Sequence, residues 1–206
     1  MVRKLLVFAL LAAPFAAAHK DFKDSYSETR ALRPGAKLHL QWKVGDVRIV
    51  KGTDPNNLHI HYTVRSSSES AMKNAKVEFR GEDNDLTIET HSSFHGNTSI
   101  DADIEIPDQV NLDVRLKVGD LEVDDIVGDK DLGVSVGDIR VRGGDTPEYR
   151  SVHAKTGIGD VDWTPPKGTP TDALHQSGWL GHNVSYISTG KYELRAEVSV
   201  GDIQLH

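Results

Sequence analysis

The segment Val136-Gly137-Asp138-Ile139-Arg140-Val141 begins with a tetrapeptide that occurs five times along the chain. Each copy has Val or Ile, then Gly-Asp, then Val, Leu or Ile, and an alternation of polar and apolar residues follows it. The copies are Val44-Gly45-Asp46-Val47, Val118-Gly119-Asp120-Leu121, Val136-Gly137-Asp138-Ile139, Ile158-Gly159-Asp160-Val161 and Val200-Gly201-Asp202-Ile203. A motif that returns at a near-constant interval is typical of folds that stack one structural unit on the next. The repeat therefore predicts an architecture, but it does not name a function.

The spacing of the glycines favours a regular stack in the C-terminal half. Gly119, Gly137 and Gly159 are 18 and 22 residues apart, whereas Gly201 follows 42 residues after Gly159. Gly181 lies near the middle of that gap and begins a degraded copy, in which His182-Asn183 replaces the Asp. The sequence thus predicts repeats of 18–22 residues stacked in chain order, each forming one coil of a β-solenoid whose strands rise by about 4.8 Å per level.

Alternation with a period of two dominates the rest of the chain and predicts an all-β fold. It is clearest in residues 58–64 and in residues 110–118, where apolar Val110, Leu112, Val114, Leu116 and Val118 alternate with polar residues. Only residues 68–75 have a helical pattern. An antiparallel β-sandwich would also have short alternating strands. A right-handed β-solenoid is favoured because a sandwich does not require one tetrapeptide at five sites.

The N-terminus has the pattern of a secretory signal peptide. Arg3 and Lys4 precede an apolar stretch, and Ala16-Ala17-Ala18 resembles a cleavage site, so residues 1–18 are predicted to be removed. Residues 19–206 would then form one domain, with 19–117 as an irregular first part and 118–206 as the regular repeats. Export to the periplasm, the cell surface or the medium is the expected localisation.

Composition narrows the classes of function. The mature chain has 22 basic and 31 acidic residues, a net charge of −9, which makes nucleic acid a poor partner. It contains no cysteine, so disulfides, thiol nucleophiles and a lipid anchor on cysteine are excluded. No segment after residue 18 is long and apolar enough to predict an integral membrane span.

The motif residues have expected roles at the corners of a coil. Glycine would allow a positive φ or a close approach of the next coil, and the Asp would accept hydrogen bonds from backbone amides. Chain-order stacking places Asp120, Asp138 and Asp160 above one another, and Glu122, Arg140 and Asp162 in an outward row of alternating charge. A calcium site along the Asp row is the alternative. Calcium-binding solenoids carry a denser Gly-Gly-x-Gly-x-Asp pattern, which is absent here.

Together with Ile104-Glu105-Ile106-Pro107 and Leu112-Asp113-Val114, the five motif copies resemble the bacterial putative-adhesin family over roughly residues 35–206. Members of that family are exported domains of unknown function with repeated Gly-Asp strands. The resemblance implies a right-handed β-solenoid in the envelope or outside the cell. It supplies no catalytic or ligand-binding residues that could be transferred to this chain.

No familiar catalytic motif is present, and no cofactor is expected. The strongest metal candidates are His59 and His61, which lie on one face of a strand, with His39 on another strand as a third ligand. Solvent-facing histidines are the simpler interpretation. If the signal is cleaved after Ala18, His19 becomes an N-terminal residue able to bind copper, but nothing else in the sequence supports that site.

Two hypotheses for function follow. The first is a non-enzymatic, adhesin-like protein that presents a repetitive β surface to an envelope polymer or to a protein partner. The second is a carbohydrate-active or metal-binding secreted protein that uses outward rows of His or Asp. The absence of catalytic motifs favours the first.

Overall fold

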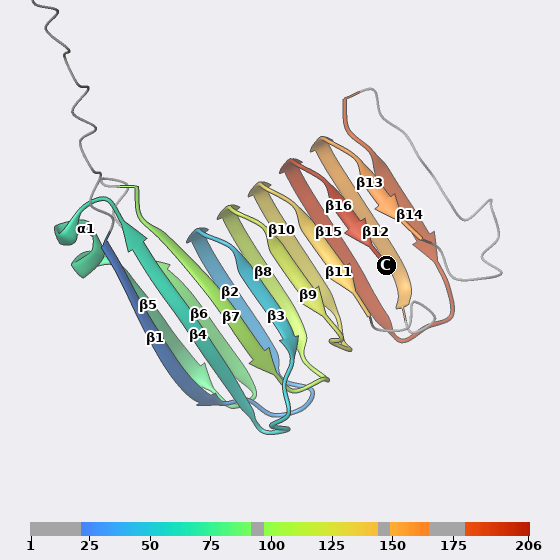
Figure 1. The fold of residues 1–206 in the computed structure, drawn as a ribbon. Coiled ribbons are helices and arrows are strands. Elements are labelled where there is room, and N and C mark those ends of the chain that lie inside the picture. Colours follow the sequence, from blue (N-terminus) through green and yellow to red (C-terminus); the bar gives the residue numbers. More distant parts are fainter. Residues whose placement is uncertain (1–21, 92–96, 144–148, 165–179) are drawn as a thin grey trace, which may run out of the picture.

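The computed structural model describes residues 22–91, 97–143, 149–164 and 180–206; the predicted signal peptide and His19 lie outside these residues. The described chain is all-β except for one short helix, as the alternation predicted. Two eight-stranded sheets face each other and enclose the core between them (Figure 1). The chain passes from one sheet to the other at corners, and we call one strand of each sheet with the corner that joins them a rung.

Sheet A contains the strands that mostly follow the Gly-Asp corners. Its spatial order is β1 (Phe22–Ala31), β4 (Asn57–Ser66), β7 (Ser99–Ile106), β3 (Val47–Lys51), β9 (Leu121–Asp124), β11 (Ile139–Arg142), β16 (Ile203–Leu205) and β13 (Val161–Trp163). From β7 to β13 all neighbours pair in parallel, whereas β1 and β4 add antiparallel strands at one end.

Sheet B contains the strands that mostly precede the corners. Its spatial order is β14 (Asn183–Ile187), β12 (Tyr149–Ile158), β15 (Tyr192–Val200), β10 (Lys130–Val136), β8 (Asn111–Val118), β2 (Lys37–Val44), β6 (Asp85–His91) and β5 (Lys76–Glu82). Only the two outer pairs are antiparallel. Because both sheets are largely parallel, the fold is a β-solenoid-like stack and the alternative of an antiparallel sandwich is wrong.

The order of the rungs differs from the predicted chain order. Gly45 stacks against Gly119, so the first copy belongs to the same row as the later ones. The last copy, at Gly201, lies between those at Gly137 and Gly159, because β15 pairs with both β10 and β12. The predicted ladder that placed Gly181 between Gly159 and Gly201 is therefore wrong. Gly181 forms an isolated bridge with Gly159 on its far side.

The core consists of inward-facing aliphatic side chains from both sheets, in one cluster that runs from Leu32 to Leu205. Strand β8 follows the predicted alternation from Leu112 to Leu116, which are 2% exposed or less. Val118 differs, since 45% of it is exposed. It is the last residue before the corner, where the chain has already left the space between the sheets.

The helical pattern of residues 68–75 corresponds to helix α1 (Glu69–Asn74). Ser68 caps it by accepting a hydrogen bond from the Ala71 N–H, and Ala71 is its buried residue. The helix lies near the end of the stack formed by β1, β4 and β5 (Figure 1).

Candidate functional site

The Gly-Asp corners form a continuous hydrogen-bonded ladder along one edge of the stack. In each rung, the Asp N–H donates to the Oδ1 carboxylate oxygen of the Asp in the adjacent rung. The donor–acceptor distances are 3.0 Å for Asp120 to Asp46, 3.0 Å for Asp138 to Asp120, 2.9 Å for Asp202 to Asp138 and 2.8 Å for Asp160 to Asp202. Each carboxylate thus satisfies an amide of the neighbouring rung, and not of its own corner.

Glycine is required in this ladder for two reasons, which Gly137 illustrates. Its φ is +132°, a conformation that residues with a Cβ rarely adopt. In addition, a Cβ at this position would overlap the carbonyl oxygen of Gly119 in the adjacent rung. The glycines of the other four copies also have positive φ.

The two ends of the Asp ladder have different partners. At the first end, the Asp46 N–H donates to Asp101 Oδ1 at 3.2 Å. At the other end, Asp160 Oδ1 lies 2.8 Å from Nδ1 of His182, the residue that replaces Asp in the degraded copy. The degraded copy therefore completes the ladder with a side chain of complementary polarity.

Charge in the row is partly balanced by Arg140, whose guanidinium lies 3.0 Å from Asp138 Oδ2 and 3.4 Å from Asp120 Oδ2. The predicted row of alternating charge is only partly correct. Glu122 does lie beside Arg140, but Gln204 separates Arg140 from Asp162 because β16 is inserted there.

A second, shorter ladder lies at the opposite corner, at Gly128-Asp129. The Asp129 N–H donates to Asn111 Oδ1, and Asp129 Oδ1 accepts from the Glu193 N–H, both at 2.9 Å. Gly128 has a φ of +137°. The same device thus also fixes the register at this corner.

The three candidate metal ligands do not converge. His59 and His61 face outward from β4 in sheet A, whereas His39 faces outward from β2 in sheet B, on the other side of the core. Each has a polar neighbour: His59 contacts Thr29 at 3.0 Å, His61 contacts Ser27 at 3.0 Å, and His39 contacts Asp113 at 3.1 Å. The predicted approach of His39 to the other two is wrong. Across the described ranges, no group of three or more His, Cys, Asp or Glu residues could hold a metal ion.

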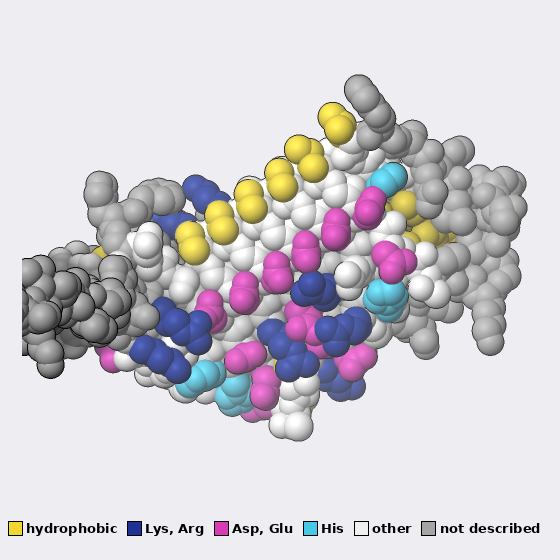
Figure 2. All heavy atoms as spheres, turned by 45° about the horizontal axis from the view of Figure 1, so that its top comes forward, with side chains coloured by type: hydrophobic (Ala, Val, Ile, Leu, Met, Phe, Trp, Pro, Cys, Tyr) yellow, Lys and Arg dark blue, Asp and Glu magenta, His cyan; other side chains and the backbone are white. Residues whose placement is uncertain are grey.

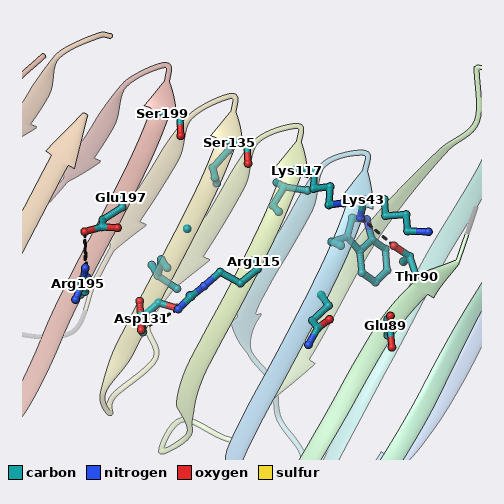
Figure 3. A pocket seen from close by; sticks show the side chains of 16 residues that line it. Lys43, Glu89, Thr90, Arg115, Lys117, Asp131, Ser135, Arg195, Glu197 and Ser199 are labelled. Carbon is teal, nitrogen blue, oxygen red and sulfur yellow. Dashed lines mark hydrogen bonds and ion pairs between the residues drawn. The ribbon is translucent and has the colours of Figure 1, made fainter. Parts of the chain in front are cut away.

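The outer face of sheet B carries a groove of about 740 Å³ (Figure 3). Its floor is formed where side chains are small. Gly133 lies between Arg115 and Glu197 in the register of the sheet. Ser135 and Ser199 continue the floor towards the Gly-Asp corner.

Charged side chains of both signs flank that floor. The Arg115 guanidinium donates to the side-chain carboxylate of Asp131 and to the backbone carbonyl oxygen of Asp131, both at 2.9 Å. Arg195 binds Glu197 at 2.7 Å, and this hydrogen bond raises the pKa of the Arg195 guanidinium. Lys117 also lines the groove (Figure 3), and within the described part of the chain it forms no ion pair. The groove therefore offers alternating positive and negative groups to a ligand.

An apolar row runs parallel to the Asp ladder, on its sheet B side (Figure 2). It consists of the apolar residue that precedes Gly-Asp in four of the five copies, those at Gly119, Gly137, Gly201 and Gly159, extended by the residue before Gly181. The exposed fractions are 45% for Val118, 48% for Val136, 44% for Val200, 57% for Ile158 and 68% for Leu180. We call these five residues the apolar ridge.

Sequence reasoning missed both surfaces. The apolar ridge had a detectable signal, because every motif copy has Val or Ile before the glycine, at a corner where a solvated residue could vary freely. The groove had none, since its residues come from β2, β6, β8, β10 and β15, and their juxtaposition depends on the order of strands in sheet B.

No protein family and no curated protein matches this chain in sequence. Among solved structures, a "putative cell adhesion protein" of Clostridium sporogenes is similar, with 18% identity, a TM-score of 0.49, and coverage of 88% of this chain and 99% of that one. A "putative adhesin" of Parabacteroides distasonis has 14% identity and a TM-score of 0.30, over 88% of this chain and 70% of that one. In the described ranges no helix is both long and apolar enough to cross a membrane.

Proposed function

We propose that this chain is a non-enzymatic, exported binding module of the adhesin-like type, which uses the outer face of sheet B to hold an envelope polymer or a protein partner. The groove over Gly133 is the observation that carries the proposal. There the small outward-facing residues of sheet B leave a trough between larger side chains. Charged groups from five strands line this trough.

The groove suits an extended ligand with polar groups along its length. Its lining residues are fixed by strands, and Arg115 is held by contacts to Asp131 as well as to the Val114 carbonyl oxygen. A site on rigid strands loses little conformational entropy when a ligand binds. Because both signs of charge are present, hydroxyls, amides and isolated charges of a polysaccharide or an extended peptide could all find partners.

The same structure argues against catalysis by the Asp rows. A general acid or base needs an oxygen that is available to the reacting group. In the ladder, one oxygen of Asp46, Asp120, Asp138 and Asp202 already accepts a backbone amide. For Asp120 and Asp138 the second oxygen also faces Arg140. We propose that the row is structural, within a right-handed coil whose repeats maintain the groove.

The test uses a glycan array and immobilised envelope fractions with the mature chain. Gly133 has no positive φ, and an added Cβ would meet only the flexible Arg115 side chain, 3.1 Å away. Gly133→Thr should therefore fill the trough while the sheet remains folded. We expect it to weaken binding at least tenfold.

Charge is tested separately with Lys117→Ala in the groove and Lys23→Ala on β1 of the other sheet as the matched control. Lys117→Ala should weaken binding several-fold, and Lys23→Ala should leave it unchanged. Binding that survives both groove variants would place the ligand elsewhere. Silence on all glycans, with binding to envelope protein, would identify the partner as a protein.

The alternative of a metal-dependent carbohydrate-active protein is tested by metal analysis of refolded mature chain. Zinc, copper or calcium bound in stoichiometric amounts would favour that alternative over the binding module. Among the described residues the sheet A histidines are the place to look first, since His59 also lies 3.4 Å from Asp54.

A further inference from the structure

We propose that the apolar ridge is a self-association surface, on which a second copy of this chain docks with its own ridge. Seven large apolar side chains are exposed in the described part of the chain, and five of them belong to this single row. Scattered exposed apolar residues need no explanation, whereas a continuous row marks an interaction site. Figure 2 shows the row as an uninterrupted line beside the acidic one.

The period of the ridge identifies its occupant. Its side chains are stacked by parallel strand pairing, so they repeat at the strand spacing of about 4.8 Å. A β-strand lying along the ridge would present one face every ~6.8 Å, and a helix one turn every ~5.4 Å, so both would lose register within a few rungs. Another stack of β rungs has the matching period, and a second copy of this chain provides one with the same apolar row.

Charge selects one orientation of the two copies. The acidic ladder lies on the sheet A side of the ridge, whereas Lys117 lies next to Val118 on the sheet B side, and Lys43 follows it in the adjacent rung of Asp46. A two-fold axis parallel to the ridge would place the acidic ladder of each copy opposite the lysines of the other. An antiparallel arrangement would instead place acidic ladder against acidic ladder, which is unfavourable.

The dimer is expected to be weak. Five rungs at about 4.8 Å give a strip about 20 Å long and one side chain wide. Such a strip buries much less surface than the roughly 800 Å² per partner of a stable interface. The association should therefore depend on protein concentration, and it would be favoured where many copies are held close together.

Sedimentation velocity of the mature chain over a wide concentration range tests the association. We expect a reversible monomer–dimer equilibrium, and at least a tenfold larger dissociation constant for Val136→Asp, because a charge in the contact would have to be desolvated. Ile187→Asp is the matched control, since Ile187 is 79% exposed on β14, away from the ridge. A chain that stays monomeric at all concentrations, or equal effects of the two variants, would overturn the proposal.

The orientation is tested with single cysteines, which the chain permits because it has none. With a two-fold axis parallel to the ridge, each ridge residue faces its own counterpart. Val136→Cys should then form a disulfide-linked dimer under mild oxidation, and Ile187→Cys should not. Val200 is the central residue of the ridge, so an antiparallel arrangement would place Val136 opposite Ile158. In a mixture of Val136→Cys and Ile158→Cys chains, only the two homodimers should form; a dominant heterodimer would show the antiparallel arrangement and contradict the charge argument.

The groove and the ridge are distinguishable in these experiments. Gly133→Thr changes the trough but not the ridge, so it should leave the dissociation constant of the dimer unchanged. Val136→Asp changes the ridge but not the trough, since Val136 does not line the groove, so it should leave ligand binding unchanged. Lys117 lies at both surfaces, and Lys117→Glu should weaken self-association several-fold as well as ligand binding, since its charge would then repel the opposing acidic ladder.

Discussion

Two constraints meet at Gly137: a positive φ and a close approach to the adjacent rung. A comparison with Gly35 separates their effects on stability. Gly35 also has a positive φ, of +81°, but a Cβ there would meet no atom within 4 Å, whereas a Cβ on Gly137 would overlap the carbonyl oxygen of Gly119. We expect Gly35→Ala to reduce the free energy of unfolding by about 1–2 kcal/mol. Gly137→Ala should reduce it by about 3 kcal/mol or more, because the rungs must also separate. Urea denaturation measures both, and equal losses would show that the close approach is unimportant.

Asp138 links two rungs through a single carboxylate. It accepts the Asp202 N–H at 2.9 Å and lies 3.0 Å from the Arg140 guanidinium. Asp138→Ala leaves that N–H without its acceptor, which should lower the free energy of unfolding by about 1–2 kcal/mol. Asp138→Asn keeps an acceptor oxygen of similar position and should recover most of the loss. If alanine and asparagine are equally destabilising, the carboxylate charge matters more than the hydrogen bond.

At the scale of elements, the insertion of β15 and β16 sets this stack apart from a simple sequential one. These C-terminal strands lie between β10–β11 and β12–β13, which precede them in the chain. A chain that ends at Ser188 therefore loses an interior rung, and not a terminal one. We expect this truncation to abolish cooperative unfolding and to expose the amides of β12 to hydrogen exchange.

Removal of the edge strand β1 is the matched control for that truncation. It also deletes a complete strand, but β1 pairs only with β4 at the end of sheet A. The shortened chain should keep the protection of β8 and β10. If the chain ending at Ser188 retained full protection in β12, strands β10 and β12 would have closed the gap, and the interior rung would be dispensable.

The elements themselves were largely predictable, whereas their order was not. Alternation of apolar and polar residues predicted strands such as β4 and β8, because that pattern follows from the pleat of a single strand. The position of β15 depends on which of several equivalent parallel partners it pairs with. All copies of the motif offer the same corner geometry, so the motif could not distinguish Gly201 after Gly181 from Gly201 between Gly137 and Gly159.

For the whole molecule, the continuous core and the interior position of the C-terminal rung predict one cooperative unit. The cluster of buried side chains runs without a break from Leu32 to Leu205. Native-state hydrogen exchange should therefore give the same opening free energy for the most protected amides of β2 and β15. A markedly lower value in one of them would divide the chain into two independently unfolding parts.

The candidate surfaces differ in how far the sequence could predict them. Every motif copy has Val or Ile before its glycine, as with Val136 and Val200 of the ridge, but alternation alone does not distinguish these residues from buried apolar ones. They become exposed because the corner lies outside the space between the sheets. The groove depends on Gly133, whose neighbours Arg115 and Glu197 are distant in sequence and become adjacent only through strand pairing.

The sequence by itself determined the all-β class, the position of helix α1 and the corners with their Gly-Asp pairs, because each follows from local patterns of side-chain size, polarity and backbone freedom. Only the tertiary structure decided the order of the rungs, the separation of His39 from His59 and His61, and the two exposed surfaces. These features arise from pairing between strands far apart in the chain. Because every corner has the same Gly-Asp geometry, the ladder allows any of these pairings locally. The packing of the whole stack determines which of them forms.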